Sequence, residues 1–383
     1  MKPRPRRNIS FLIVTTLLLL AIGFGVSQEL NLYTNLRICA NQDGWTLTFR
    51  QQNLFDDDSQ FHISQASQKS PTQWSPPRNY RGKFSASVLV GSQLTIFQSE
   101  GASLYKNGDW IGNLALHLPW TPLDSLSFDH GVTLIGTHEN KLKAAILEKG
   151  HSYPITTPSS TISQHPLGPM RLATIGETPW VFWGMRKSSS PLATHLLASK
   201  ILRITTPFDP IFSVGWPASK FPNFHFLALS SPISLRVPHP FKNMTVLSPT
   251  SPNRSHDSNC WIFLHSPSSP QSPNTLSVTA FDGQTMARPS VEIPLPKQTV
   301  LAQEVLSIEA FQSNSELCLL LGGIGGINMI STQKVLSGEW LDHGKILGTT
   351  QTRESGIYFL MIALLVLSLA ILFRGIRLIR FQR

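Results

Sequence analysis

Hydrophobic positions between residues 28 and 355 come in short runs rather than in long helical stripes. The runs are rich in β-branched and aromatic residues and are bounded by Gly, Pro, Ser and Asn; they include WTLTFR, QLTIFQ, VTLIGT, WVFWGM, FHFLAL, CWIFLH and ELCLLLGG. Runs of this length with these boundaries are typical of β-strands. The 28 prolines of the chain, most of them between Pro154 and Pro296, leave little room for four-turn helices. The pattern predicts an all-β domain.

Spacing between the predicted strands indicates a repeat. Residues 91–110 and 130–153 each contain an apolar strand that ends at a Glu-containing turn, then a second strand, then a closing Gly turn. Leu94 in the first stretch matches Leu134 in the second, an offset of 40 residues. Repeats of about 40 to 45 residues are typical of the four-stranded blades of β-propellers. We expect about six blades; further strands of the same buried type begin near Trp180, Phe224, Trp261 and Glu316.

Closure of such a ring predicts where its ends lie. We expect the strand at residues 44–50 to pair with the last blade, so that both ends of the domain leave the ring side by side. Tandem β-sandwiches are the alternative fold, because they use the same short strands and turns.

Two uncharged apolar segments flank the domain. Residues 9–26 and 356–373 are each long enough to cross a bilayer core of about 30 Å. A basic tail, residues 1–8, precedes the first segment, and another, residues 374–383, follows the second. Positively charged flanks remain in the cytoplasm. The sequence therefore predicts two transmembrane helices, two cytoplasmic termini and one outer domain, residues 28–355.

The first apolar segment has a second interpretation as a cleavable signal peptide, since Gly23 and Gly25 are small residues where a signal peptidase requires them. In both cases residues 28–355 are extracytoplasmic. The short basic tails and low cysteine content favour a bacterial inner membrane with the domain in the periplasm. A eukaryotic lumen or cell surface is the alternative location.

The net charge of +10 is concentrated in the two tails, which contain Lys2, Arg4, Arg6, Arg7, Arg374, Arg377, Arg380 and Arg383. These residues leave the outer domain close to neutral, without the clustered Lys and Arg that nucleic-acid binding requires. The tail charges suit the topology and attraction to anionic headgroups. The predicted partners are therefore membrane lipid at the helices and a protein or glycan at the outer domain, and no nucleic acid.

Residues 127–134, SFDHGVTL, resemble the Asp-box S-x-D-x-G-x-T-W of sialidases and related propellers. Ser127, Asp129, Gly131 and Thr133 match the motif, and Leu134 replaces its aromatic residue. In that family the box stabilises a turn away from the catalytic centre. The resemblance, which covers eight of 383 residues, therefore implies a propeller fold and does not imply hydrolysis.

Three cysteines, Cys39, Cys260 and Cys318, permit at most one disulfide. Cys39 precedes the expected closing strand and Cys318 lies in the last predicted blade, so a bridge between these two is the more attractive pairing. Buried free thiols are the alternative. No Cys-x-x-Cys motif or Cys/His cluster indicates a metal site, and no cofactor-binding fingerprint is complete.

Acidic residues offer few candidates for catalysis. Asp109, Asp124, Asp129 and Glu139 are expected in turns of the two clearest blades, where paired carboxylates could act on a glycosidic bond. Capping of the turn backbone explains the aspartates equally well. The sequence shows no catalytic constellation, and enzymatic activity stays an open alternative.

Trp74 and Trp216 are the candidate contact residues of the outer domain. Each lies beside prolines in a predicted loop, where an exposed ring can bind a partner. The other tryptophans, Trp110 among them, are expected to pack within and between blades.

These features favour a membrane-anchored extracytoplasmic protein that binds or scaffolds a ligand through its propeller. A surface carbohydrate-active hydrolase, the first alternative, would require acidic residues that converge in the central funnel. A subunit of a larger membrane complex, the second, would use its transmembrane helices as the contact surface.

Overall fold

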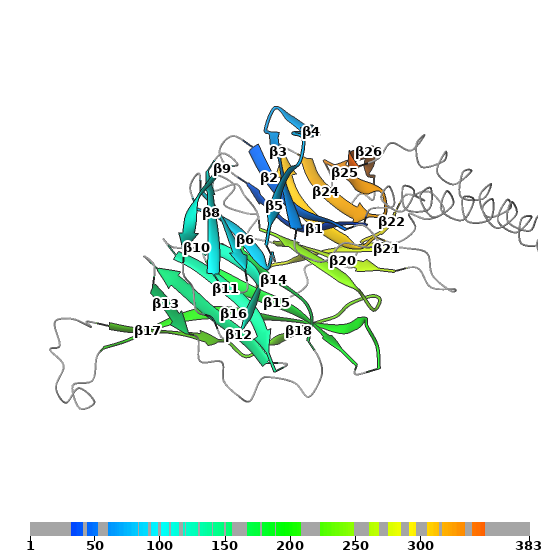
Figure 1. Cartoon of the computed structure of the whole chain (residues 1–383). Helices are drawn as coiled ribbons and strands as arrows, with labels where there is room; N and C mark the ends of the chain where they lie inside the picture. Colours follow the sequence, from blue (N-terminus) through cyan, green and yellow to red (C-terminus); the bar gives the residue numbers. More distant parts are fainter. Residues whose placement is uncertain are drawn as a thin grey trace, which may run out of the picture.

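The computed structural model describes residues 32–348 with gaps at 41–43, 53–59, 83, 91–92, 99–100, 107–108, 115–117, 119, 129–130, 140, 149–150, 155–166, 177, 188, 208–222, 249–259, 268–274, 285–290, 296–304, 314–315 and 334–338. In these residues the regular secondary structure is β-strand throughout (Figure 1). No helix among them has the length and apolar character needed to cross a bilayer. The segments 9–26 and 356–373, expected as transmembrane helices, lie outside the described residues.

The strands form six antiparallel sheets, each built from strands that are consecutive in the chain. Blade 1 contains β1 (Leu32–Ala40), β2 (Gly44–Gln52), β3 (Gln60–Ser67), β4 (Ser70–Trp74) and β5 (Arg78–Arg81). Blade 2 contains β6 (Ala86–Val90), β7 (Gln93–Gln98), β8 (Gly101–Lys106) and β9 (Asp109–Leu114). Blade 3 contains β10 (Thr121–Phe128), β11 (Gly131–His138), β12 (Lys141–Glu148) and β13 (His151–Pro154).

The second half of the chain repeats this arrangement. Blade 4 contains β14 (Leu167–Ile175), β15 (Thr178–Arg186), β16 (Ala193–Pro207), β17 (Asn223–Leu229) and β18 (Ile233–Leu235). Blade 5 contains β19 (Asn243–Leu247), β20 (Cys260–Ser266), β21 (Thr275–Phe281) and β22 (Val291–Pro294). Blade 6 contains β23 (Ser307–Ser313), β24 (Glu316–Gly323), β25 (Gly326–Thr332) and β26 (Leu341–Gly348).

The first strand of each blade faces the centre of the molecule. These inner strands contact one another in a closed order, from β1 through β6, β10, β14, β19 and β23 and back to β1. A closed order of six sheets defines a six-bladed β-propeller. The tandem β-sandwiches considered as the alternative are wrong, because two separate sandwiches would not bring the first and last sheets together.

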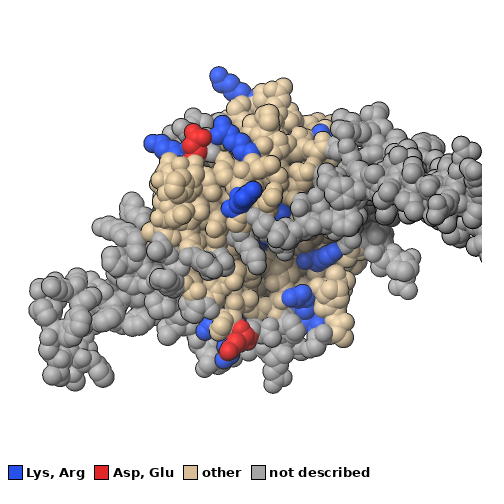
Figure 2. Space-filling model, viewed as in Figure 1, with Lys and Arg blue, Asp and Glu red and all other residues tan. Residues whose placement is uncertain are grey.

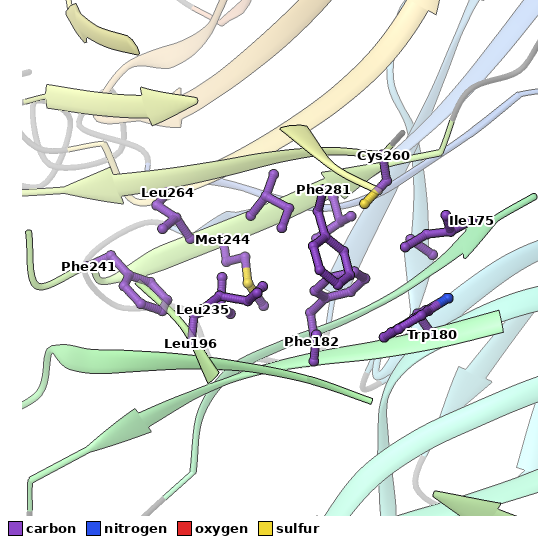
Figure 3. Close-up of a cluster of buried hydrophobic side chains, with 14 of the residues drawn as sticks. Ile175, Trp180, Phe182, Leu196, Leu235, Phe241, Met244, Cys260, Leu264 and Phe281 are labelled. Atoms are coloured by element: carbon purple, nitrogen blue, oxygen red, sulfur yellow. The ribbon is translucent and has the colours of Figure 1, made fainter. Parts of the chain in front are cut away.

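Six hydrophobic clusters hold the ring together, and each one lies between two neighbouring blades. The seam between blades 4 and 5 is the largest (Figure 3), where the rings of Trp180, Phe182 and Phe281 meet edge to face or stacked. Successive side chains of a strand point to opposite faces. Ile262 therefore packs toward blade 4 while its neighbour Phe263 packs toward blade 6. Because both faces of these strands are buried, their sequences are continuous apolar runs.

Blades 1 and 6 meet without exchanging a strand. Residues 44–50, expected to pair with the last blade, lie in β2, which pairs with β1 and β3 inside blade 1. The junction is closed instead by Asn35, whose backbone N–H donates to Ser307 Oγ at 2.6 Å and whose Nδ2 donates to the Leu320 carbonyl at 3.0 Å. The expected strand exchange is wrong because blade 1 already supplies neighbours on both sides of β2.

The first and last described residues nevertheless lie together. Leu32 forms an isolated antiparallel bridge with Ile324, and Gly348 is the partner of Gly326. Both contacts are made to the turn between β24 and β25, so the chain enters and leaves the ring at one place. The expected adjacency of the two ends is confirmed. The face of the propeller at which the inner strands begin, and from which both ends leave, is called the start face below.

The repeat predicted from the sequence corresponds to blades 2 and 3. Leu94 lies in β7 and Leu134 in β11, the second strand of each blade, and both are buried. The strand near Phe224 is not the start of a separate blade, since it is β17 at the outside of blade 4. Blade 1, interpreted from the sequence only as a closing strand, completes the six.

All three cysteines are free and buried. Cys39 packs in the seam between blades 1 and 2, and Cys318 packs in the seam between blades 6 and 1. The two side chains thus lie on opposite faces of blade 1. The expected bridge between them is absent for this reason.

Candidate functional site: a charged belt on the propeller axis

Four charged side chains project from inner strands of four different blades. They are Arg37 on β1, Asp124 on β10, Arg171 on β14 and Glu309 on β23, and together they form what we call the axial charge belt. Asp124 and Glu309 are each 2 % exposed. Burial of an unpaired charge is costly, so the two carboxylates require close cationic partners.

Asp124 is held by blade 1 and by blade 4. The Arg37 guanidinium lies 3.1 Å from one carboxylate oxygen of Asp124, and the backbone N–H of Leu172 donates to the other at 2.6 Å. The adjacent Ser125 hydroxyl donates to the carbonyl of Ser87 in blade 2 at 2.7 Å. These contacts connect blade 3 with three other blades.

Glu309 is held across the axis. Its carboxylate accepts a hydrogen bond from the Arg171 guanidinium at 2.6 Å and another from the backbone of Ile38. Arg171 belongs to blade 4 and Ile38 to blade 1, so Glu309 joins blade 6 to both. Charge-assisted bonds of this kind are stronger than neutral ones.

Burial and the neighbouring charges shift the pKa values of Glu309 and Arg37 in opposite directions. Burial raises the pKa of Glu309 above its ordinary value, and the nearby Arg171 and Arg37 offset this only in part. Burial would lower the pKa of the Arg37 guanidinium, but attraction to Asp124 and Glu309 outweighs it and the pKa is raised. The belt thus places two guanidinium groups beside two carboxyl groups.

The geometry of the belt limits its chemistry. A carboxyl group with a raised pKa resembles the general acid of a glycosidase. A general acid must also reach its substrate within hydrogen-bond distance. Glu309 and Asp124 are buried and already bonded to arginine and backbone donors. The belt is arranged to join blades, and it offers no accessible carboxylate pair.

The three described acidic residues among those proposed from the sequence are not brought together. Asp124 lies on the inner strand β10 rather than in a turn, and Asp109 begins the outer strand β9, where it pairs with Arg78 at 3.2 Å. Glu139 lies in the turn between β11 and β12 with a φ of 51°. Asp129 lies outside the described residues. Among the described residues no group of three or more His, Cys, Asp or Glu could hold a metal ion.

The stretch that resembles an Asp-box forms the β10–β11 hairpin of blade 3. Phe128 pairs with Gly131, and Ser127 pairs with Val132 across the hairpin. Thr133 is buried. Asp129, the defining residue of the motif, is outside the described part of the chain, so the resemblance stays a prediction.

Of the two tryptophans proposed as contact residues, the structure describes only Trp74. Trp74 packs edge to face against Phe311, 6.3 Å between ring centroids, in the seam between blades 1 and 6. It is not an exposed rim residue, because β4 lies beside β26 there. Trp216 lies outside the described residues. The tryptophan that does project is Trp110, which is 59 % exposed on β9 and was expected to be buried.

Sequence reasoning did not find Arg37, Arg171 or Glu309. Each interrupts a short run of apolar and small residues, in NLRICA, GPMRLATI and SIEAFQS. A single charge within an otherwise apolar inner strand is the signal that was available. Its partner lies in another blade, 138 residues away for Arg171 and Glu309, so no local spacing connects the two.

Comparison with protein-family models and with curated proteins gives no match to this chain. Among solved structures, the hemagglutinin-neuraminidase of parainfluenza virus 5 is similar at a TM-score of 0.45 and 8% identity over 82% of this chain and 89% of that one. A flat-faced bat subtype N11 neuraminidase-like protein is similar at a TM-score of 0.42 and 11% identity over 84% and 90%. The α-L-arabinofuranosidase of Lactobacillus brevis gives 0.38 and 8% over 58% and 72%. With all three TM-scores below 0.5, the fold is assigned from the sheet order and the closed ring alone.

Proposed function

We propose that this protein is a membrane-anchored, extracytoplasmic binding or scaffolding protein whose propeller presents its outer surface to a partner. The observation that carries the proposal is the state of Asp124 and Glu309, which are buried and held by arginines on the axis. Fold alone does not assign a function, since propellers serve many. The charged side chains at the centre of the ring stabilise the fold, so we place the binding site on the outer surface of the blades.

The carboxyl groups on the propeller axis do not support the surface-hydrolase alternative. Glycoside hydrolysis requires two carboxyl groups on either side of an accessible glycosidic bond. The solved propellers similar to this chain include a neuraminidase-type protein and an arabinofuranosidase by name, and their low similarity does not carry those activities over. No observation on the described residues favours hydrolysis over binding.

The outer strand of blade 2 is the best candidate for a contact surface. Trp110 and Ile111 are adjacent on β9 and are 59 % and 51 % exposed. Tryptophan is enriched at interfaces because it combines a large apolar area with one polar atom. The indole N–H of Trp110 donates to Asn113 Oδ1 at 3.1 Å, which favours this orientation of the ring. β9 is also an edge strand, with one side unpaired by any other described strand.

Photocrosslinking of the full chain in intact cells tests this proposal. A photoreactive phenylalanine analogue replaces Trp110 in one variant and the exposed Leu341 of blade 6 in a control variant. We expect a discrete crosslinked product from position 110 and none from position 341. Absence of a product at position 110, together with glycoside cleavage that is lost in Glu309→Gln while the variant stays folded, would support hydrolysis instead.

A further inference from the structure

Both ends of the propeller leave from the start face, next to the β24–β25 turn. Leu32 bridges Ile324, and Gly348 pairs with Gly326. The apolar segments 9–26 and 356–373 end six residues before Leu32 and begin eight residues after Gly348. An extended chain spans at most about 3.6 Å per residue, so the connections reach roughly 22 and 29 Å. If both segments span a bilayer, the start face lies close to its headgroups.

Exposed basic side chains gather on the start face of blades 3 and 4. Lys141 begins β12, opposite His138 at the end of β11. Lys187 follows Arg186, whose guanidinium donates to the carbonyl of Leu167 at the beginning of the inner strand β14. Both lysines are exposed.

A third exposed cation, Arg236, follows β18 and lies on the same face, because Leu235 pairs with Leu196 near the start of β16. We call Lys141, Lys187 and Arg236 the basic surface. Figure 2 shows several basic side chains and few acidic ones on the surface that faces the viewer.

Among the described residues, the acidic side chains near this surface are few. Glu139 is exposed in the turn beside Lys141, and Glu292 of blade 5 is paired with His239 at 2.8 Å. The acidic run 56–58 lies outside the described residues. Exposed acids instead mark the opposite face, where Asp109, Asp282, Glu339 and Asp342 lie at the far ends of their blades.

We propose that the basic surface contacts anionic phospholipid headgroups, so that the propeller rests on the membrane by its start face and presents the opposite face to partners. This inference rests on the membrane anchoring in the proposed function. Basic residues held near an anionic membrane are attracted to it, and the attraction falls off within a Debye length of about 8 Å at physiological salt. The short connections hold blades 1 and 6 near the membrane, and a propeller that lies flat on its start face brings the basic surface of blades 3 and 4 within that range.

Amide hydrogen exchange on the full chain in lipid nanodiscs tests the inference. One set of discs contains phosphatidylcholine alone, and the other contains three parts phosphatidylcholine to one part phosphatidylglycerol. We expect the β11–β12 turn and the residues after β15 to exchange more slowly in the anionic discs, while the turn between β8 and β9 on the opposite face is unchanged. Equal exchange of the start-face turns in the two discs overturns the inference.

Two charge-matched variants separate local contact from net charge. Lys141→Glu with Lys187→Glu should lose the slow exchange in anionic discs, and Lys69→Glu with Lys106→Glu, on the opposite face, should retain it. Loss in both variants overturns the inference, since it would show an effect of net charge alone. A chain that enters the discs but shows no lipid dependence overturns only this inference. A chain that does not enter them overturns the membrane anchoring, and the inference with it.

Discussion

The guanidinium of Arg171 lies 2.6 Å from the carboxylate of Glu309, and this ion pair connects blade 4 to blade 6 across the axis of the propeller. The two residues are 138 positions apart in the chain. The carboxylate of Glu309 is not open to a substrate, since its side chain is 2 % exposed. The ion pair therefore stabilises the ring, and loss of one partner should lower the free energy of unfolding.

Removing one partner of this pair should destabilise the propeller strongly. Glu309→Leu leaves the Arg171 cation buried without its closest anion, and a loss of about 3 kcal/mol or more in the free energy of unfolding is expected. Arg171→Leu should cost a similar amount. The double variant should lose much less than the sum, because the desolvation cost of both charges disappears with them. Urea unfolding of the four proteins measures this, and additive losses would contradict the coupling.

The raised pKa of Glu309 predicts the sign of a pH effect. A carboxyl group with a raised pKa in the folded state binds protons more tightly there than in the unfolded chain. Its contribution to stability is therefore greatest at low pH and falls as the pH rises through the window above the ordinary glutamate pKa. The unfolding free energy of wild type minus that of Glu309→Gln should therefore fall from acid toward neutral pH, because Gln resembles the protonated acid at every pH. A difference that grows instead would mean that Arg171 lowers this pKa.

Closure of the ring depends on a close approach at Gly322. A Cβ there would lie 2.6 Å from the Tyr33 carbonyl and 3.2 Å from the Asn35 backbone nitrogen of blade 1. Gly322→Ala should push blades 1 and 6 apart and cost about 2 kcal/mol. Gly112→Ala is the matched control, since nothing lies within 4 Å of its Cβ, and it should change stability by less than about 0.5 kcal/mol. Equal effects of the two substitutions on thermal unfolding would refute this closure.

The three cysteines should be unreactive in the folded protein. Burial raises the pKa of the Cys39 thiol to about 11 and that of Cys318 to about 12, and it raises the pKa of Cys260 as well. Thiolate, not thiol, is the nucleophile. A thiol reagent should label none of them quickly in the native state and all three after denaturation without reductant. Recovery of only one thiol would instead indicate a disulfide.

The fold was predictable from the sequence, and the manner of its closure was not. Strands, their spacing and the approximate number of blades follow from apolar runs such as those that contain Leu94 and Leu134, because both faces of an inner blade are buried. Which strand closes the ring depends on contacts between Asn35 and Ser307, 272 residues apart. No local pattern records such a contact.

The same limit applies to the site. The sequence predicts Asp124 in a turn and gives no indication of a role for Arg37, Arg171 or Glu309, since each is a lone charge in its own strand. The exposure of two tryptophans also differs from the prediction. Prolines beside Trp74 indicated a loop, but the neighbouring blade covers that ring, and the outermost position of β9 leaves Trp110 in solvent.

The most direct test of the account is the topology of the full chain in its membrane. Single cysteines are introduced as Pro3→Cys, Gln382→Cys and Leu341→Cys, and a membrane-impermeant maleimide is applied to intact and to permeabilised cells. The native cysteines are buried and give little background. We predict that position 341, exposed on blade 6, is labelled when the outer side of the membrane is reached, while positions 3 and 382 are labelled only after permeabilisation. Labelling of either terminus from outside would contradict a propeller that both ends of the chain anchor to one membrane.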